Sequence, residues 1–124
     1  MIAYLRAEPG ADVMLRILTD PQSRCYAHAI NVYEAYRDSL TRGTVAEADQ
    51  AIAELIQAGI IVREDFDEAL WKDAARRKAS HRMSTADSIG IALASRLSAD
   101  FVSTDHHELD PVNDSGAYVI TFIR

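Results

Sequence analysis

The sequence has 124 residues and a mass of 13.7 kDa, which is the size of one domain with a single core. Hydrophobic residues make up 48% and charged residues 26%, as in ordinary globular proteins, so collagen-like, coiled-coil and disordered classes are excluded. The net charge of -6 and the pI near 5.1 argue against nucleic-acid binding through bulk positive charge. Any nucleic acid must therefore be held by local contacts.

The single cysteine, Cys25, excludes an internal disulfide, and no cysteine and histidine spacing is typical of a zinc site. The apolar residues before Pro9 are too few for a signal peptide, and no apolar run approaches the ~18 residues that a membrane span needs. We therefore expect a soluble protein of a reducing compartment, the cytoplasm, with no membrane partner.

Five elements are predicted in the first half of the chain. The helices are indicated by apolar residues at spacings of three and four, and the turns by glycine and proline. Gly43 and Gly59 follow the last two helices, where glycine is a common stop. The predicted elements are helices over residues 1–7 and 11–19, a short strand over 24–29, and helices over 30–42 and 44–58.

The second half continues the alternation of strands and helices. The β-branched run over residues 60–62 has no polar alternation, so we predict a strand covered on both faces. Ser84 and Asp87 fit a capping box at the start of the clearest helix. The remaining predictions are helices over residues 66–79 and 84–97, strands over 101–104 and 118–123, and a loop after Asp105.

The order of these elements predicts an α/β protein in which a parallel sheet lies between helical layers. No repeat, linker or low-complexity tract divides the chain, so residues 1–124 are predicted to form one domain. The sequence opens in a helix, whereas such an alternation normally opens with a strand. We therefore expect the first strand to be missing.

Three acidic residues stand where strands are followed by helices. Glu34 lies near the start of the helix that follows residues 24–29, one turn after Ile30. Asp87 lies in the first turn of a helix, and Asp105 directly follows residues 101–104. Ligand sites of parallel sheets lie at the carboxyl ends of the strands, so the three carboxylates are expected to converge there. Converging carboxylates repel each other unless a cation lies among them. Mg²⁺ or Mn²⁺ fits such hard oxygen ligands and would activate a water for attack on a phosphate.

Each acid also has a simpler interpretation. Asp87 can be a helix cap, Asp105 a turn residue before a loop, and Glu34 a surface side chain. Taken singly, these interpretations are favoured. Because three separate boundaries on one predicted sheet edge each carry an acid, we favour a shared functional site.

The only dense basic cluster is formed by Arg76, Arg77, Lys78, His81 and Arg82. Such residues often accumulate at a helix C-terminus to complement its dipole, and this interpretation is as good as nucleic-acid binding. Arg82 is the best candidate for holding an RNA phosphate because it is nearest in sequence to Asp87. Arg77 and Thr104 are further candidates for nucleic-acid contacts.

The aromatic residues of the predicted helices lie at helical spacing within apolar arcs. This position is typical of core residues rather than of a binding surface. We therefore predict that Tyr33, Tyr36 and Trp71 are buried.

Several segments together resemble PIN-domain proteins. Residues 84–94 (STADSIGIALA) and 100–109 (DFVSTDHHEL) are similar to the carboxyl-terminal signature of that family. Residues 30–34 (INVYE) resemble its second acidic motif, and residues 2–5 and 8–11 its first helix. Within the family the sequence is most similar to VapC-like toxins of toxin–antitoxin pairs.

The resemblance implies a three-layer PIN-like fold and a magnesium-dependent endoribonuclease. Glu34, Asp87 and Asp105 are the residues that match the family's metal-binding and catalytic acids. It also implies RNA as substrate, an antitoxin protein as partner, and pairing of two copies into a homodimer.

One departure from the family pattern affects these expectations. PIN proteins typically carry their first aspartate at the end of a central strand before the first helix, and no residue here matches it. We therefore expect weak metal binding and impaired cleavage from this chain. The alternative is a PIN-like binding module that acts through an antitoxin or through self-association. A flap-type DNA nuclease uses similar acids, but the chain lacks additional DNA-wrapping elements.

Overall fold

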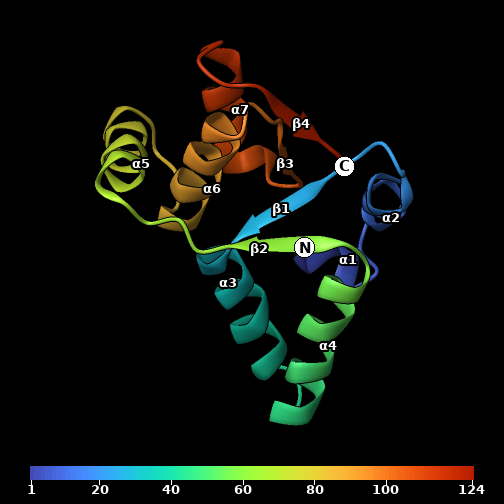
Figure 1. The fold of residues 1–124 in the computed structure, drawn as a ribbon. Coiled ribbons are helices and arrows are strands. Elements are labelled where there is room, and N and C mark those ends of the chain that lie inside the picture. Colours follow the sequence, from blue (N-terminus) through green and yellow to red (C-terminus); the bar gives the residue numbers. More distant parts are fainter. The chain divides into compact units, whose positions relative to one another are not determined.

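The computed structural model describes residues 1–124, which form two compact units, Met1–Glu64 and Asp65–Arg124 (Figure 1). The mixture of helices and parallel strands confirms the predicted α/β class. The four strands pair as two two-stranded parallel sheets, one in each unit. No helix has the length and apolar character that a membrane crossing requires.

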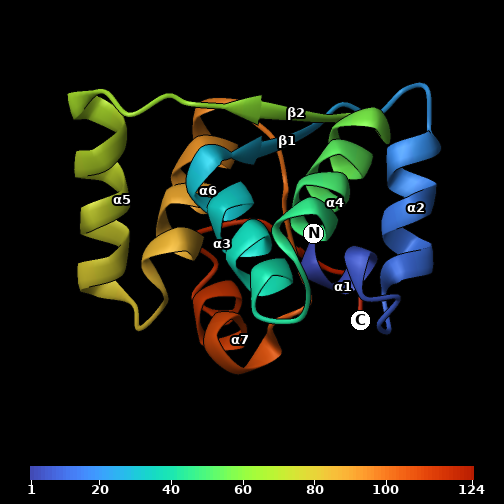
Figure 2. The ribbon, with the colours of Figure 1, turned by 90° about the horizontal axis from the view of Figure 1, so that it is seen from below.

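The first unit is a strand–helix–helix–strand arrangement preceded by two helices. Strands β1 and β2 pair in parallel, with Cys25 opposite Ile60 and His28 opposite Arg63. Helices α3 and α4 connect these strands and pack against each other (Figure 2). The elements in chain order are α1 (Ile2–Leu5), α2 (Ala11–Thr19), β1 (Cys25–His28), α3 (Ala29–Leu40), α4 (Val45–Gln57) and β2 (Ile60–Arg63).

Local hydrogen bonds set the helix boundaries of the first unit. Thr44 and Glu47 form a reciprocal capping box at the start of α4, in which Glu47 Oε2 accepts from the Thr44 N–H at 2.7 Å. Gly59, with a φ of 116°, turns the chain from α4 into β2. A bidentate contact between Arg6 and Asp38 joins the residue after α1 to α3.

Two expectations for the first unit are wrong. Ile61 in β2 is 44% exposed, so this strand is not covered on both faces. Tyr33 is 57% exposed, although its neighbour Ala35 is fully buried. Helical spacing places a residue near an apolar arc, but only the packing of other elements decides whether its side chain is covered.

The second unit contains two packed helices, a parallel strand pair and a short helix between the strands. In chain order the elements are α5 (Glu68–Ser80), α6 (Thr85–Arg96), β3 (Phe101–Ser103), α7 (His106–Asp114) and β4 (Ile120–Phe122). Phe101 lies opposite Ile120, and Ser103 lies opposite Phe122. The core gathers Met83, Ile91, Leu109, Val112 and Ile120, with Phe101, Tyr118 and Phe122 packed against it.

Helices α5 and α6 are fastened at one end by an ion pair. Asp67 is the N-cap of α5, and its carboxylate also accepts from Arg96 in the last turn of α6, at 2.6 and 2.7 Å. Asp65 adds a second carboxylate to Arg96 at 3.3 Å. Trp71 on α5 is 42% exposed, so the prediction that it belongs to the core is wrong.

The segment after Asp105 is a helix, α7, and the predicted loop is wrong. Asp105 is its N-cap and accepts from the Glu108 N–H at 3.1 Å. Leu109 and Val112 are fully buried, three residues apart on the same helix face. Pro111 lies inside the helix, and this proline together with the polar run hides the helical pattern in the sequence.

The burial of Leu109 provides a test of this helix. Leu109→Ala should lower the free energy of unfolding by roughly 2–5 kcal/mol, because it leaves a cavity in the core of the second unit. Val119 is 68% exposed, and Val119→Ala should change stability by no more than about 0.5 kcal/mol. Urea unfolding followed by circular dichroism measures both values. Equal, small effects would contradict a packed α7.

The Asp67–Arg96 contact predicts a pH dependence of stability. The hydrogen bonds from Arg96 and then from the Leu70 N–H lower the pKa of Asp67 from 3.8 to about 2. A lowered pKa contributes stability above the usual pKa, and this contribution is lost as the pH falls toward 2. The melting temperature of Asp67→Asn, which keeps the N-cap acceptor, should therefore fall less between about pH 4 and pH 2 than that of the parent. Parallel curves would exclude this contact as a source of acid sensitivity.

Candidate active site

Asp87 lies at the start of α6 and is held by the N-cap residue. The Ser84 Oγ accepts from the Asp87 N–H at 3.0 Å and donates its own proton to Asp87 Oδ2 at 2.7 Å. The N-terminal end of a helix stabilises a negative charge. The local sequence therefore fixes the carboxylate of Asp87 in one position at a favourable helix end.

Glu108 closes the same helix end from α7. Its Oε2 accepts from the Ser84 N–H at 2.9 Å, the bond that the N3 residue makes in a standard capping box. The predicted capping box is thus only half confirmed, because the backbone of Ser84 is taken by an acid 24 residues later. This bond ties the start of α6 to α7.

Asp105 lies between β3 and α7. Its backbone N–H donates to Ser103 Oγ at 3.0 Å, and its carboxylate caps α7 through the Glu108 N–H. The side chain is exposed. Asp105 is therefore a helix cap at the end of a strand, and the same cap places Glu108 one turn further on.

The charges around Asp87 make this end of α6 anionic. Partial burial is the largest cause that raises the pKa of Asp87, and the negative charges of Glu108 and Asp105 raise it further. The hydrogen bond from Ser84 and the positive charge of Lys78 act in the opposite direction. Lys78 itself donates to the Met83 carbonyl at 2.7 Å. The ionised form of Asp87 is thus disfavoured, and a cation bound nearby would stabilise it.

Glu34 belongs to the first unit, on α3. The helix begins after His28, whose Nδ1 accepts from the Ile30 N–H at 3.1 Å. Glu34 follows one turn after Ile30 and is half-buried. Asp87 and Asp105 belong to the second unit. The convergence of Glu34 with these two acids therefore stays a prediction.

The structure contains no group of three or more histidine, cysteine, aspartate or glutamate side chains arranged to hold a metal ion. The donors in the second unit nevertheless have the right chemistry, because carboxylate oxygens are what Mg²⁺ and Mn²⁺ prefer. Asp87 also gains from a positive charge, since burial and two acids disfavour its ionised form. On donor chemistry, the carboxylates of Asp87 and Asp105 suit a divalent cation, whereas Glu108 is bonded to the Ser84 N–H.

The basic cluster divides between surface and interior. Arg76, Lys78 and Arg82 are exposed, whereas Arg77 is buried and paired with Asp73 at 2.9 Å. Arg82 is the exposed arginine nearest in sequence to Asp87. Thr104, the remaining candidate, is half-buried between β3 and Asp105.

Sequence reasoning missed Glu108. The sequence predicts a loop after Asp105, and a loop gives no reason for the side chain of Glu108 to point back to Ser84. The signal was present, because Asp105 followed three residues later by Glu108 has the spacing of a capping box, with aspartate as the cap.

A comparison with family models matches residues 1–112 to the PIN domain. The chain belongs to the PIN domain family. Proteins of this family are generally metal-dependent nucleases that act on RNA. The match spans both compact units and includes Glu34, Asp87 and Asp105. A search of curated proteins found no match.

The raised pKa of Asp87 predicts how the melting temperature of the protein responds to magnesium. Without metal, Asp87→Asn should raise the melting temperature at neutral pH, since it removes an ionised carboxylate whose pKa is raised by burial. Asp87 with a raised pKa destabilises the folded protein only when its carboxyl group is ionised. The higher melting temperature of Asp87→Asn should therefore disappear as the pH falls below about 4. Mg²⁺ should stabilise the parent but not the variant. Thermal unfolding measures both effects.

The exposed residue Asp114, at the other end of α7 from Asp105, offers a matched control for this measurement. Asp114→Asn removes one negative charge outside the group of acids that acts on Asp87 and should leave the stabilisation by Mg²⁺ unchanged. Equal stabilisation of the parent and of Asp87→Asn would mean that Asp87 does not contact the ion.

Proposed function

We propose that this PIN-domain protein is a magnesium- or manganese-dependent endoribonuclease of the VapC-like toxin type, acting in the cytoplasm. The observation that carries the proposal is the half-buried carboxylate of Asp87, fixed by Ser84 and surrounded by Glu108 and Asp105. A nuclease needs acids that are held in place and whose charge the protein leaves largely uncompensated. Asp87 meets both requirements, because its pKa stays raised despite the positive charge of Lys78.

We further propose that the two compact units form one PIN-like domain. The family match runs from residue 1 to residue 112 and so crosses the boundary at Glu64 and Asp65. In one domain Glu34 would join Asp87 and Asp105 as the third acid of the site. This placement explains why an acid occurs after β1 as well as after β3.

In phosphodiester hydrolysis each of these residues would have a separate role. Glu34, Asp87 and Asp105 would hold the divalent ion. The ion supplies charge neutralisation at the phosphate and lowers the pKa of a bound water. Ser84 keeps Asp87 in one orientation, and Glu108 keeps the helix end in place through the Ser84 N–H. Such fixed positioning matters because small misplacements of catalytic groups cost large factors in rate.

Phosphate binding would come from a few local cations, since the chain as a whole is acidic. Arg82 is the favoured phosphate ligand, because it is exposed and stands five residues before Asp87. Thr104, next to Asp105, can offer a hydroxyl to a phosphate or to water. These contacts restrict RNA binding to the neighbourhood of the acids.

The alternative is a PIN-like binding module that works through an antitoxin or through a second copy of the chain. The observation that favours it is the acid set, because no residue of this sequence matches the first aspartate of the family. Exposed apolar side chains, among them Tyr33, Ile56 and Trp71, are available for a protein partner.

Cleavage of a fluorescent RNA in the presence of Mg²⁺ tests the nuclease directly. Asp87→Asn, Asp105→Asn and Glu34→Gln should each lower the cleavage rate by at least about a hundredfold, since each removes a charged ligand. Glu108→Gln should have a smaller effect, because Glu108 acts through Ser84 and not on the metal. The exposed Asp114→Asn is the matched control and should retain full activity.

Two outcomes of the same assay would refute the proposal. Cleavage that persists in all three acid variants would identify a contaminating nuclease. Binding of RNA or of an antitoxin with no cleavage by the parent, at any Mg²⁺ or Mn²⁺ concentration, would establish the binding-module alternative.

A further inference from the structure

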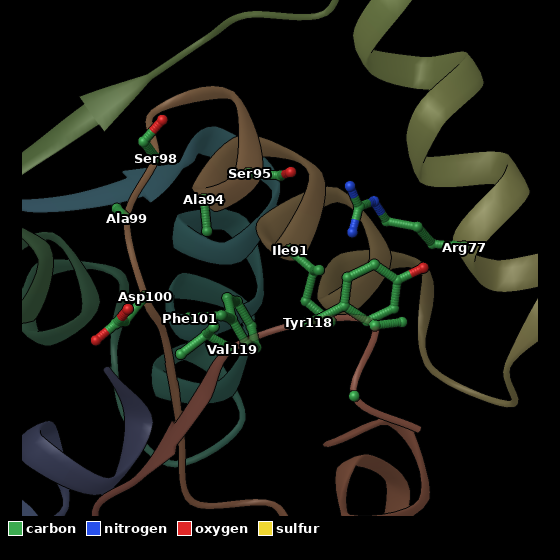
Figure 3. Close-up of a pocket in the computed structure, with 12 residues that line it drawn as sticks. Arg77, Ile91, Ala94, Ser95, Ser98, Ala99, Asp100, Phe101, Tyr118 and Val119 are labelled. Atoms are coloured by element: carbon green, nitrogen blue, oxygen red, sulfur yellow. The ribbon is translucent and has the colours of Figure 1, made fainter. Parts of the chain in front are cut away.

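The second unit contains a cavity of about 330 Å³ at the end of α6 that is opposite to Asp87. Its walls come from α5, the C-terminal half of α6, the start of β3 and residues 116–119. Figure 3 shows Arg77 beside Tyr118 at one end of this pocket and Asp100 at the other. The lining is mixed, since Ile91 and Phe101 are apolar whereas Arg77, Ser95 and Asp100 are polar.

Arg77 brings an unused hydrogen-bond donor to the pocket. The side chain is nine-tenths buried, and its Nε and Nη2 both donate to Asp73 Oδ2, at 3.0 and 2.9 Å. Its guanidinium carbon lies 4.3 Å from the centroid of the Tyr118 ring. Nη1 is shielded from solvent and has no hydrogen-bond acceptor in the protein. Buried polar groups without an acceptor are rare and costly, so a small shift of the Arg77 or Tyr118 side chain that lets a ligand supply an acceptor to Nη1 would be favoured.

The surrounding charges decide which kind of acceptor fits. Asp73 already compensates the charge of Arg77, and Asp100 adds a second carboxylate to the pocket wall. The C-terminal end of α6 adds the partial negative charge of the helix dipole. A phosphate or a carboxylate is therefore disfavoured. A neutral group with a carbonyl or ring nitrogen for Arg77 and with N–H donors for the acidic side fits better.

We propose that this pocket binds an unpaired nucleobase of the RNA substrate. A nucleobase is neutral, carries both acceptors and donors on its edge, and stacks on aromatic rings and guanidinium planes. The proposal rests on the nuclease function proposed above. Asp87 and Ser95 are eight residues apart on α6, about 12 Å along the helix axis, so the bound base lies away from the acids and selects the substrate.

Nucleosides are the first probe, because they carry a base without a phosphate. Guanosine, adenosine, cytidine and uridine are titrated separately, without metal, into the ¹⁵N-labelled protein. At least one should shift the amide signals of Ser95, Gly116 and Tyr118. Arg77→Gln should weaken its binding about tenfold or more, as expected for loss of a hydrogen bond from a charged donor. No shift with any nucleoside would overturn the proposal.

A second variant blocks the pocket without removing Arg77. Ala99 lines the cavity and is exposed, so Ala99→Trp should fill the space and abolish nucleoside binding while the protein remains folded. Ala75→Trp, at an exposed position of α5 outside the pocket lining, is the matched control and should bind as the parent does. Undiminished binding by a folded Ala99→Trp protein would place the nucleoside elsewhere and overturn the proposal.

The salt dependence of RNA binding separates a base contact from a phosphate contact. With a fluorescent oligoribonucleotide in EDTA, Arg77→Gln should lower the affinity by the same factor at every salt concentration. A phosphate contact would instead reduce the slope of log K against log salt by about one. That reduced slope would overturn the proposal.

The outcomes for the pocket and for the nuclease are distinguishable. If cleavage depends on Asp87 but Ala99→Trp leaves KM unchanged, the pocket proposal fails and the nuclease stands. If nucleosides bind but no RNA is cleaved, the nuclease fails and the pocket stands. If an antitoxin peptide shifts the pocket signals and nucleosides do not, a protein segment is the occupant and the nucleobase proposal is wrong.

Discussion

The hydrogen bond from the Ser84 N–H to Glu108 constrains the whole acidic end of the second unit. Helix ends leave backbone N–H groups without partners, and here one of them is satisfied by a residue of another helix. Because Asp105 caps the helix that carries Glu108, and Ser84 holds Asp87, the three acids are linked through backbone groups. Their separation is thus set by side chains that are each held by a hydrogen bond at a helix cap.

Much of the fold could be predicted from the sequence, since most helices and strands are indicated by local patterns of apolar residues and glycines. Gly43 and Gly59 mark helix ends, and the apolar spacing in residues 84–97 predicts α6 to within two residues. Helix α7 could not be recognised by apolar spacing alone. Its helical state depends on the cap at Asp105 and on the burial of Leu109 and Val112, and burial is a property of the folded unit.

For the site, the sequence predicts which residues carry charge but not how they are held. Asp87 could be named from its helix start, and Asp105 from its strand end. The spacing of Asp105 and Glu108 indicates a helix start, but it does not indicate that Glu108 bonds to Ser84, because that partner lies 24 residues earlier. Arg77 shows that a charged residue in a basic run need not lie on the surface. It belongs to a basic run that suggests a surface patch, yet its side chain is buried against Tyr118 and paired with Asp73.

Helix α7 has only nine residues, too few for a helix to persist in water without tertiary support. Two apolar side chains anchor it, and its interior proline leaves one backbone carbonyl without its usual helical donor. A transient detachment of this segment would release Glu108, expose the amide of Ser84 and loosen Asp87, while β3 and α6 kept their own hydrogen bonds. The spacing of the acids therefore depends on the shortest helix of the second unit staying docked.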